Sequence, residues 1–306
     1  MIDSQKQSVD SGGEAYQARG DINVNKGIST GQLAEIMSAV VAEIGRLSSD
    51  AARQVEERNQ ELREELTARI ADSEERVRSA FAQPDFQYAL GSAFNGYARK
   101  GTETLKNELA DLIIRRAKSQ DDDRVSEVLN QAIAVLPKLS VVDKDVLAIL
   151  FLFKNLNIID SSLSNVWVRY ESYLSSHVSR IPNGVGTFEY LQGLGCINVN
   201  LVADHFPLGE RLYNQYQNLV PKKAVDGPPV PGDVPAPKIE MPAMSQSEFV
   251  EGLRASSPSF TTLEAVWNDR LFPNSTLTSV GKAIAHSVLS TDGKLQTPVE
   301  VFLAMG

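Results

Sequence analysis

Cys196, Asp204 and His205 are the residues whose types and spacing come closest to a nucleophilic catalytic site. A thiolate attacks a substrate, an imidazole takes up a proton, and a carboxylate orients the imidazole. Adjacent residues point their side chains apart, however, and Cys196 begins an alternating segment in which a cysteine is typically a small buried apolar group. We therefore predict no catalytic residue and expect the protein not to be an enzyme.

Metal and cofactor chemistry find equally little support in the sequence. His177, His205 and His286 are far apart, and a single cysteine excludes a cysteine-based zinc site and a disulfide framework. The chain has no Gly-rich phosphate loop followed by Lys-Ser/Thr, no His-Glu-x-x-His helix and no Gly-x-Ser-x-Gly elbow. The carboxylates at 121–123 are expected to cap a helix rather than to bind a cation. We predict no cofactor and no metal.

A compact basic cluster, Arg115, Arg116 and Lys118, is a candidate contact for a polyanion. Solvated charges at a helix end are the simpler interpretation. The net charge of −9 and a pI near 5.0 also argue against broad nucleic-acid binding, which requires a surplus of basic residues on at least one face. Nucleic acid is therefore an unlikely partner on composition alone.

These residues must be positioned by a folded chain of 306 residues, of which 42% are hydrophobic. That length exceeds a single core and suggests at least two units. We predict a mainly α fold with long N-terminal helices, followed by a helical domain with a winged-helix-like strand element. The expected segments are a flexible N-terminal piece with one short strand (1–31), a long coiled-coil-like helical region (32–118), a helical core (121–220), a Pro-rich linker (221–244) and a C-terminal helical segment packing on the core (245–306).

An apolar stripe runs through the helical region with an eleven-residue period. Eleven residues over three turns correspond to about 3.67 residues per turn, typical of a nearly straight helix. We expect one helix from Gln32 until Pro84 interrupts it, and a second from about Phe86 to Lys118. The stripe has no obvious partner within the chain, and neither has the alternating strand near the N-terminus. Both features predict homo-oligomers, held together by Ile22, Val24, Leu33, Ile44, Val55 and Leu66.

The winged-helix-like outline lies between Thr187 and Leu201. A short helix is expected over 187–194, followed by Gly195 as its C-terminal stop and by an alternating strand. Groove-reading helices use basic and amide side chains together, yet this one carries Glu189 and no Lys or Arg. Seven of the chain's prolines then lie within 221–244, which predicts an extended, semi-rigid linker.

Membrane and export signals are weak. The most apolar run, Val146 to Phe153, is less than half of the roughly 20 residues that a spanning helix needs. The polar N-terminus has no apolar signal region, so we expect a cytoplasmic protein. Eleven-residue repeats also occur in helices that lie on membranes, but the mixed charges and few large apolar residues here make a membrane partner improbable.

Two segments, Tyr190 to Val199 (Tyr-Leu-Gln-Gly-Leu-Gly-Cys-Ile-Asn-Val) and Leu277 to Ala285 (Leu-Thr-Ser-Val-Gly-Lys-Ala-Ile-Ala), resemble the C-terminal half of the Abi-alpha family of bacterial abortive-infection proteins. Gly20 to Val24 (Gly-Asp-Ile-Asn-Val) also resembles short N-terminal motifs of bacterial defence proteins. The resemblance covers about a third of the chain and carries over no catalytic residue. It implies a bacterial, cytosolic protein with a role in phage defence.

Together these patterns predict a non-enzymatic, self-assembling scaffold or interaction protein with an unidentified protein partner. Two alternatives stay open. One is a DNA-binding transcription regulator that uses the winged-helix-like module. The other is a membrane-acting effector that uses the helix with the eleven-residue repeat.

Overall fold

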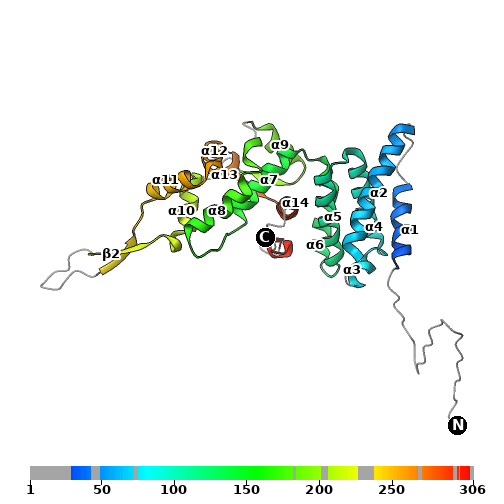
Figure 1. Ribbon diagram of the computed structural model, residues 1–306, viewed down its shortest axis with the longest axis horizontal. Helices are drawn as coiled ribbons and strands as arrows, with labels where there is room; N and C mark the ends of the chain where they lie inside the picture. Colours follow the sequence, from blue (N-terminus) through cyan, green and yellow to red (C-terminus); the bar gives the residue numbers. More distant parts are fainter. Residues whose placement is uncertain are drawn as a thin grey trace, which may run out of the picture.

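A computed structural model describes residues 29–42, 49–71, 75–181, 184–200, 206–226, 238–267, 271–291, 295 and 297–303. These residues form mainly helices with two short two-stranded sheets, which confirms the predicted fold class. The helices form an elongated body with the first helices at one end and strand β2 beyond the other (Figure 1). One continuous set of buried apolar residues runs from Leu33 to Leu303.

The N-terminal bundle contains six helices: α1 (Thr30–Ala42), α2 (Ser49–Ala71), α3 (Glu75–Ala80), α4 (Pro84–Lys100), α5 (Glu103–Lys118) and α6 (Asp123–Val135). The prediction of one helix from Gln32 to Pro84 is therefore wrong, because this stretch forms three separate helices. Pro84 does begin a new helix, in the first turn, where its missing N–H is not needed. The shorter helices can fold back, so that α2 packs on α4 and α5 while α1 packs on α4.

The central element is α7 (Val141–Lys154), in which every residue of the apolar run 146–153 is buried. A capping box begins this helix: the Ser140 hydroxyl accepts from the Asp143 N–H, and the Asp143 carboxylate accepts from the Ser140 N–H. The helices around it and after it are η1 (Leu136–Lys138), α8 (Leu163–Leu174), η2 (Val178–Arg180), α9 (Gly186–Gly193), α10 (Leu208–Gln215) and η3 (Gln217–Leu219).

The strand predicted after Gly195 is present as β1 (Ile197–Val199). Gly195 has φ 72°, a left-handed conformation that glycine adopts without strain. The partner of β1 is not a neighbouring strand, as in the hairpin of a wing, but the distant β4 (Ser275–Leu277), with Ile197 opposite Leu277. The sheet of the winged-helix-like unit is thus completed by a strand from the C-terminal segment.

That C-terminal segment comprises α11 (Gln246–Ser256), α12 (Pro258–Trp267), α13 (Leu271–Asn274), β4, α14 (Ser279–Ser290) and α15 (Val299–Leu303). Helix α14 packs on α7, α6 and α5, and it is buried over most of its length. The last long helix of the described chain therefore completes the core formed by helices of the first half.

The two described ends of the Pro-rich segment pair as antiparallel strands, β2 (Lys222–Asp226) and β3 (Lys238–Pro242). The residues between them, 227–237, lie outside the described residues. The prolines of the described part, Pro221 and Pro242, lie at the end of this ladder, where they interrupt no internal hydrogen bond. We call this pair of strands the β2–β3 arm.

Candidate functional site

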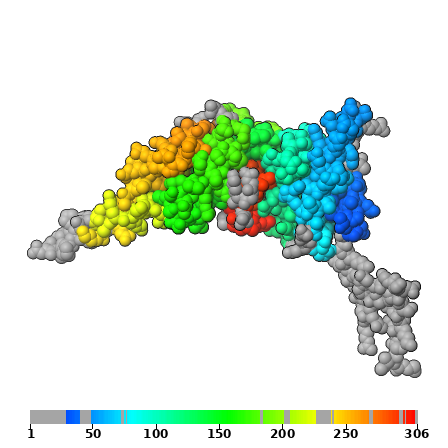
Figure 2. Space-filling model, in the orientation of Figure 1, coloured from blue at the N-terminus to red at the C-terminus, as the bar shows by residue number. Residues whose placement is uncertain are grey.

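The β2–β3 arm projects from the body beyond α10 and α11 (Figures 1 and 2). Its register pairs Lys222 with Pro242, Ala224 with Glu240 and Asp226 with Lys238. Within the described residues each strand pairs only with the other, so each keeps one edge of unpaired backbone donors and acceptors. Such an edge is a template for a further strand.

The base of the arm is fixed to the body. The Ala243 N–H donates to the Pro221 carbonyl at 2.6 Å, and the Tyr213 hydroxyl of α10 donates to the Met244 carbonyl at 3.2 Å. Val220, just before the arm, is buried. The arm therefore leaves the body in a defined direction.

The arm itself is largely exposed to solvent. Met241 exposes 48% of its surface, and Lys222 forms only a long ion pair with Glu240 on the neighbouring strand (Nζ to Oε2, 3.6 Å). A two-stranded hairpin in water is marginally stable by itself. An added strand would therefore stabilise the arm.

The described residues predicted to mediate self-association, Leu33, Val55 and Leu66, lie in the N-terminal bundle and not in the arm. Leu33 and Leu66 are buried, at 3% and 0% exposure, within the chain's own bundle. Val55 is half-buried, and Ile22, Val24 and Ile44 lie outside the described residues. Because α4 and α5 cover the stripe, the reason for assigning Leu33 and Leu66 to contacts between copies no longer holds.

The basic cluster is largely neutralised within the chain. Arg116 is buried and donates to the Asp85 carboxylate at 2.5 Å and to the Asn130 side chain at 2.8 Å. Arg115 pairs with Asp111 at 2.7 Å. Only Lys118 of the predicted cluster is exposed, so the three residues do not form an open patch for a polyanion.

Cys196 is completely buried next to β1, and burial raises the pKa of its thiol to about 12. A thiol with such a pKa has almost no thiolate at neutral pH. Asp204 and His205 lie outside the described residues. Within the described part of the chain, no three His, Cys, Asp or Glu side chains gather so as to hold a metal ion.

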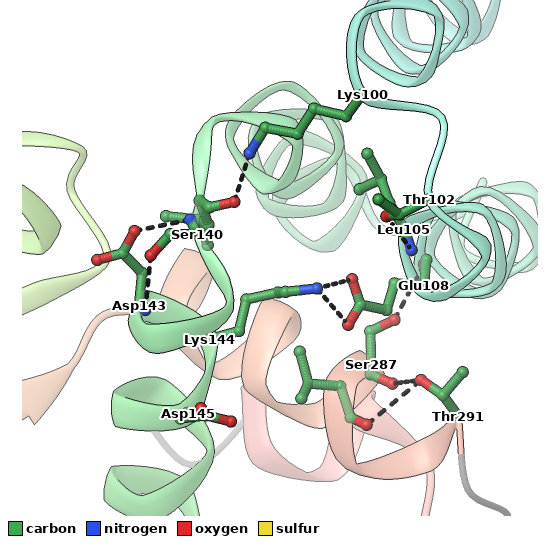
Figure 3. A network of polar contacts seen from close by, with 12 residues as sticks. Lys100, Thr102, Leu105, Glu108, Ser140, Asp143, Lys144, Asp145, Ser287 and Thr291 are labelled. Atoms are coloured by element: carbon green, nitrogen blue, oxygen red, sulfur yellow. Dashed lines mark hydrogen bonds and ion pairs between the residues drawn. The ribbon is translucent and has the colours of Figure 1, made fainter. Parts of the chain in front are cut away.

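A polar network sits between the N-terminal bundle and α7 (Figure 3). Lys144 of α7 donates to both carboxylate oxygens of Glu108 on α5, at 2.9 and 2.8 Å, and both side chains are buried. The Ser287 hydroxyl of α14 donates to the backbone carbonyl of Glu108 at 3.0 Å. Burial raises the pKa of Glu108, and Lys144 counteracts this rise. The network thus connects three helices from both halves of the chain.

Asp145, the neighbour of Lys144, forms a second ion cluster. Its carboxylate accepts from Arg180 at 2.6 and 2.9 Å and lies 2.6 Å from His177 Nδ1. Asp145 is buried, whereas Arg180 is 44% exposed. The cluster fixes η2 to α7, and we assign it a structural role.

Lys154 ends α7 beside the C-terminal segment. Its Nζ donates to the carbonyls of Pro273 and Ser275 at 2.5 Å each and lies 5.8 Å from the centre of the Trp267 ring. Burial, together with the charge of Arg211, lowers the pKa of Lys154 from 10.5 to about 8.

This shift predicts a pH dependence of stability. Between about pH 8 and 10.5 the unfolded chain holds the Lys154 proton and the folded chain has released it. The free energy of unfolding therefore rises with pH in this window. We expect the free energy of unfolding of the wild type to rise by about 2–3 kcal/mol over this window relative to Lys154→Met. Urea unfolding of both proteins at several pH values measures the difference, and parallel pH profiles would contradict the assignment.

A protein-family model matches residues 27–226 and 238–302, which is more than four-fifths of the chain. The chain belongs to that family. The family has no established function, and its match includes both strands of the β2–β3 arm. No curated protein and no solved structure shows a significant match. Among the described residues, no helix is long and apolar enough to cross a bilayer.

Sequence reasoning missed the arm as a site. A signal was present in one of its two strands, because charged and apolar residues alternate in Lys-Ile-Glu-Met at 238–241. The high proline count around this segment concealed it.

Proposed function

We propose that the protein is a non-enzymatic, self-assembling scaffold whose copies join through the open edge of β2. The observation that carries the proposal is the unpaired edge of β2 together with the opposite charges at its two ends, Lys222 and Asp226. If two copies pair antiparallel about a twofold axis at Ala224, Lys222 of each copy lies opposite Asp226 of the other, and Lys223 lies opposite Val225. Opposite charges in directly facing positions stabilise a strand pair.

Strand β3 is the less suitable edge. The same twofold pairing of β3 places Glu240 opposite Glu240, and like charges in facing positions are destabilising. Pro242 would also occupy a paired position at the strand end, where it has no N–H to donate. Pairing through β2 therefore gives a four-stranded sheet with β3 at both outer edges. Such a closed twofold interface is the commonest form of protein self-assembly.

The setting that we propose is bacterial phage defence in the cytoplasm, and its support is the resemblance of residues 190–199 and 277–285 to the Abi-alpha family. The body of the protein would then serve to hold the arm and to present further surfaces to a protein partner. The arrangement of Arg115 and Arg116 in internal ion pairs favours this interaction role over the DNA-binding alternative.

Reversing charges along β2 tests the proposal. In Lys222→Asp, two aspartates face each other at both ends of the paired segment, and each facing pair contributes roughly 0.2–1 kcal/mol. We expect self-association of the full chain to weaken about tenfold. In the triple variant Lys222→Asp/Asp226→Lys/Lys238→Asp opposite charges face each other again, both between the copies and within the arm, so the affinity should return. Multi-angle light scattering over a concentration series measures the oligomeric state.

Lys223→Asp provides the matched control, because it makes the same charge change on the same strand at a position that faces Val225 of the other copy and Met241 within the arm. Circular dichroism verifies that all variants are folded. A wild-type chain that stays monomeric at every concentration, or a triple variant that associates as poorly as Lys222→Asp, would refute pairing through β2.

A further inference from the structure

A cavity of about 500 Å³ opens where α7 ends, between the residues that follow this helix and α10. Its described lining includes Lys154 and Arg211 and no carboxylate. A second hollow beside α10 has a different character, since Glu210, Glu251 and Glu264 line it together with a single cation, Arg254, which pairs with Glu264. The first cavity is therefore a cationic site in an acidic protein.

The two cations are held in place by neutral groups. Arg211 donates from Nε to the carbonyl of Phe153 at 2.9 Å, and Lys154 donates to the carbonyls of Pro273 and Ser275. Neither forms an ion pair with a described residue. These contacts fix the side chains and leave the terminal nitrogens of the Arg211 guanidinium without a described hydrogen-bond acceptor. A guanidinium with such nitrogens can donate to two oxygens of a phosphate.

Burial makes the unpaired charges costly. Burial lowers the pKa of Arg211 and of Lys154, and the proximity of Arg211 lowers that of Lys154 further. Two partly buried cations that repel each other are stabilised by a bound anion, because each lacks a counter-charge. This observation supports a ligand that carries negative charge.

The rest of the cavity wall suits an aromatic, hydrogen-bonding body. Phe206 stands at the rim with 57% of its surface exposed, which leaves a ring face free for stacking. Asn155, Asn157 and Asn214 add amide groups to the lining. The side-chain oxygen of Asn155 is buried and has no described donor, so a ligand N–H or O–H could satisfy it.

We propose that this cavity binds a small organic phosphate of nucleotide size, with the phosphate on Arg211 and Lys154 and the planar ring against Phe206. The cavity volume lies within the usual range for small-molecule sites, about 300–1,000 Å³. Charge-assisted hydrogen bonds to the phosphate supply the affinity, and the ring and the amides supply the selectivity. The cavity is separate from the β2 edge, so the proposal of phosphate binding does not depend on the proposal of self-assembly.

Isothermal titration calorimetry of the full chain with adenosine monophosphate, inorganic phosphate and adenosine tests the proposal. We expect the monophosphate to bind most tightly, inorganic phosphate to bind more weakly and adenosine to bind weakest. Phe206→Ala should weaken binding of the monophosphate and leave that of inorganic phosphate unchanged.

Two variants examine the phosphate position. Arg211→Gln should weaken binding of the monophosphate at least about tenfold, whereas Arg99→Gln, on the exposed surface of α4, should leave it unchanged. Because Arg211 also holds Phe153, a second variant is Asn214→Asp, which adds a carboxylate at an exposed lining position and should abolish binding without removing a buried contact.

The absence of binding by both phosphates up to about 5 mM, near the weakest affinity that such contacts give, would overturn the proposal. Equal affinity for adenosine and the monophosphate, or an Asn214→Asp variant that binds as tightly as the wild type, would overturn it as well.

Discussion

Replacing Glu108 by alanine is expected to lower the free energy of unfolding by about 4 kcal/mol. The change leaves the Lys144 ammonium without its counter-charge in a site where Lys144 is only 8% exposed. Both hydrogen bonds that Lys144 makes to the carboxylate are lost, and water has little access to replace them. A buried charge without a partner is among the most destabilising defects in a protein interior.

Removing both members of the pair should cost far less. In Glu108→Met/Lys144→Met no buried charge is left, and Met side chains fill a similar volume. We expect this double variant to recover most of the loss, since apolar replacement of a buried ion pair is often neutral or stabilising.

Urea unfolding followed by circular dichroism measures these differences. Glu57→Ala serves as the control, because Glu57 and Arg53 form an exposed pair within one helix, which is worth only about 0.3–0.5 kcal/mol. Equal effects of Glu108→Ala and Glu57→Ala would show that the pair between α5 and α7 does not hold the two helices together.

Gly281→Ala should destabilise the protein by about 3 kcal/mol or more, which is the upper range for overpacked sites. A Cβ atom at position 281 would lie 2.0 Å from the carbonyl oxygen of Cys196 and 3.2 Å from a methyl group of Leu277. The carbonyl oxygen of Cys196 belongs to the backbone, so it cannot move aside by a side-chain rotation. The Thr278 N–H also donates to this carbonyl at 3.0 Å, and its hydroxyl caps α14. Making room for the methyl group therefore disturbs the β1–β4 pair and the start of α14 together.

A matched glycine isolates the effect of this contact. Gly193, near the end of α9, is exposed, and a Cβ atom added there would meet no described atom within 4 Å. Gly193→Ala should change the free energy of unfolding by less than about 1 kcal/mol. Thermal and urea unfolding of both variants decide the matter, and similar midpoints for Gly281→Ala and the wild type would argue against the close approach of α14 to β1.

Local signals in the sequence predicted local structure well. Pro84 marks the start of a helix, Ser140 opens the apolar helix of the core, and Gly195 ends α9 with a positive φ. Each of these effects depends on a few neighbouring residues, because caps and stops satisfy backbone groups within one turn. The fold class followed from these signals together with the helical periodicity.

The arrangement of the helices could not be predicted in the same way. The period of the stripe from Leu33 to Val77 is the same for one long helix and for helices that fold back on one another. It shows which side is buried but not what covers it. The helices that cover the stripe are α4 and α5. The sequence predicts this region as one helix and gives no sign that it packs on the stripe.

The candidate sites depend on contacts between distant parts of the chain. Lys154 and Arg211 lie far apart in sequence, and no motif connects them. The strands of the arm are separated by the Pro-rich stretch, which indicates extended backbone but not pairing. Sequence patterns of this kind report local geometry, whereas a binding site depends on where the core brings segments together.

The position of α14 also has a consequence for the order of events during synthesis on a ribosome. Helix α14 covers α5, α6 and α7, and Ser287 reaches the carbonyl of Glu108. During synthesis, part of the apolar surface of the N-terminal helices therefore stays exposed until α14 has been translated. Such an intermediate is a natural client for a chaperone, and it would become a native protein only when the last helices emerge from the exit tunnel.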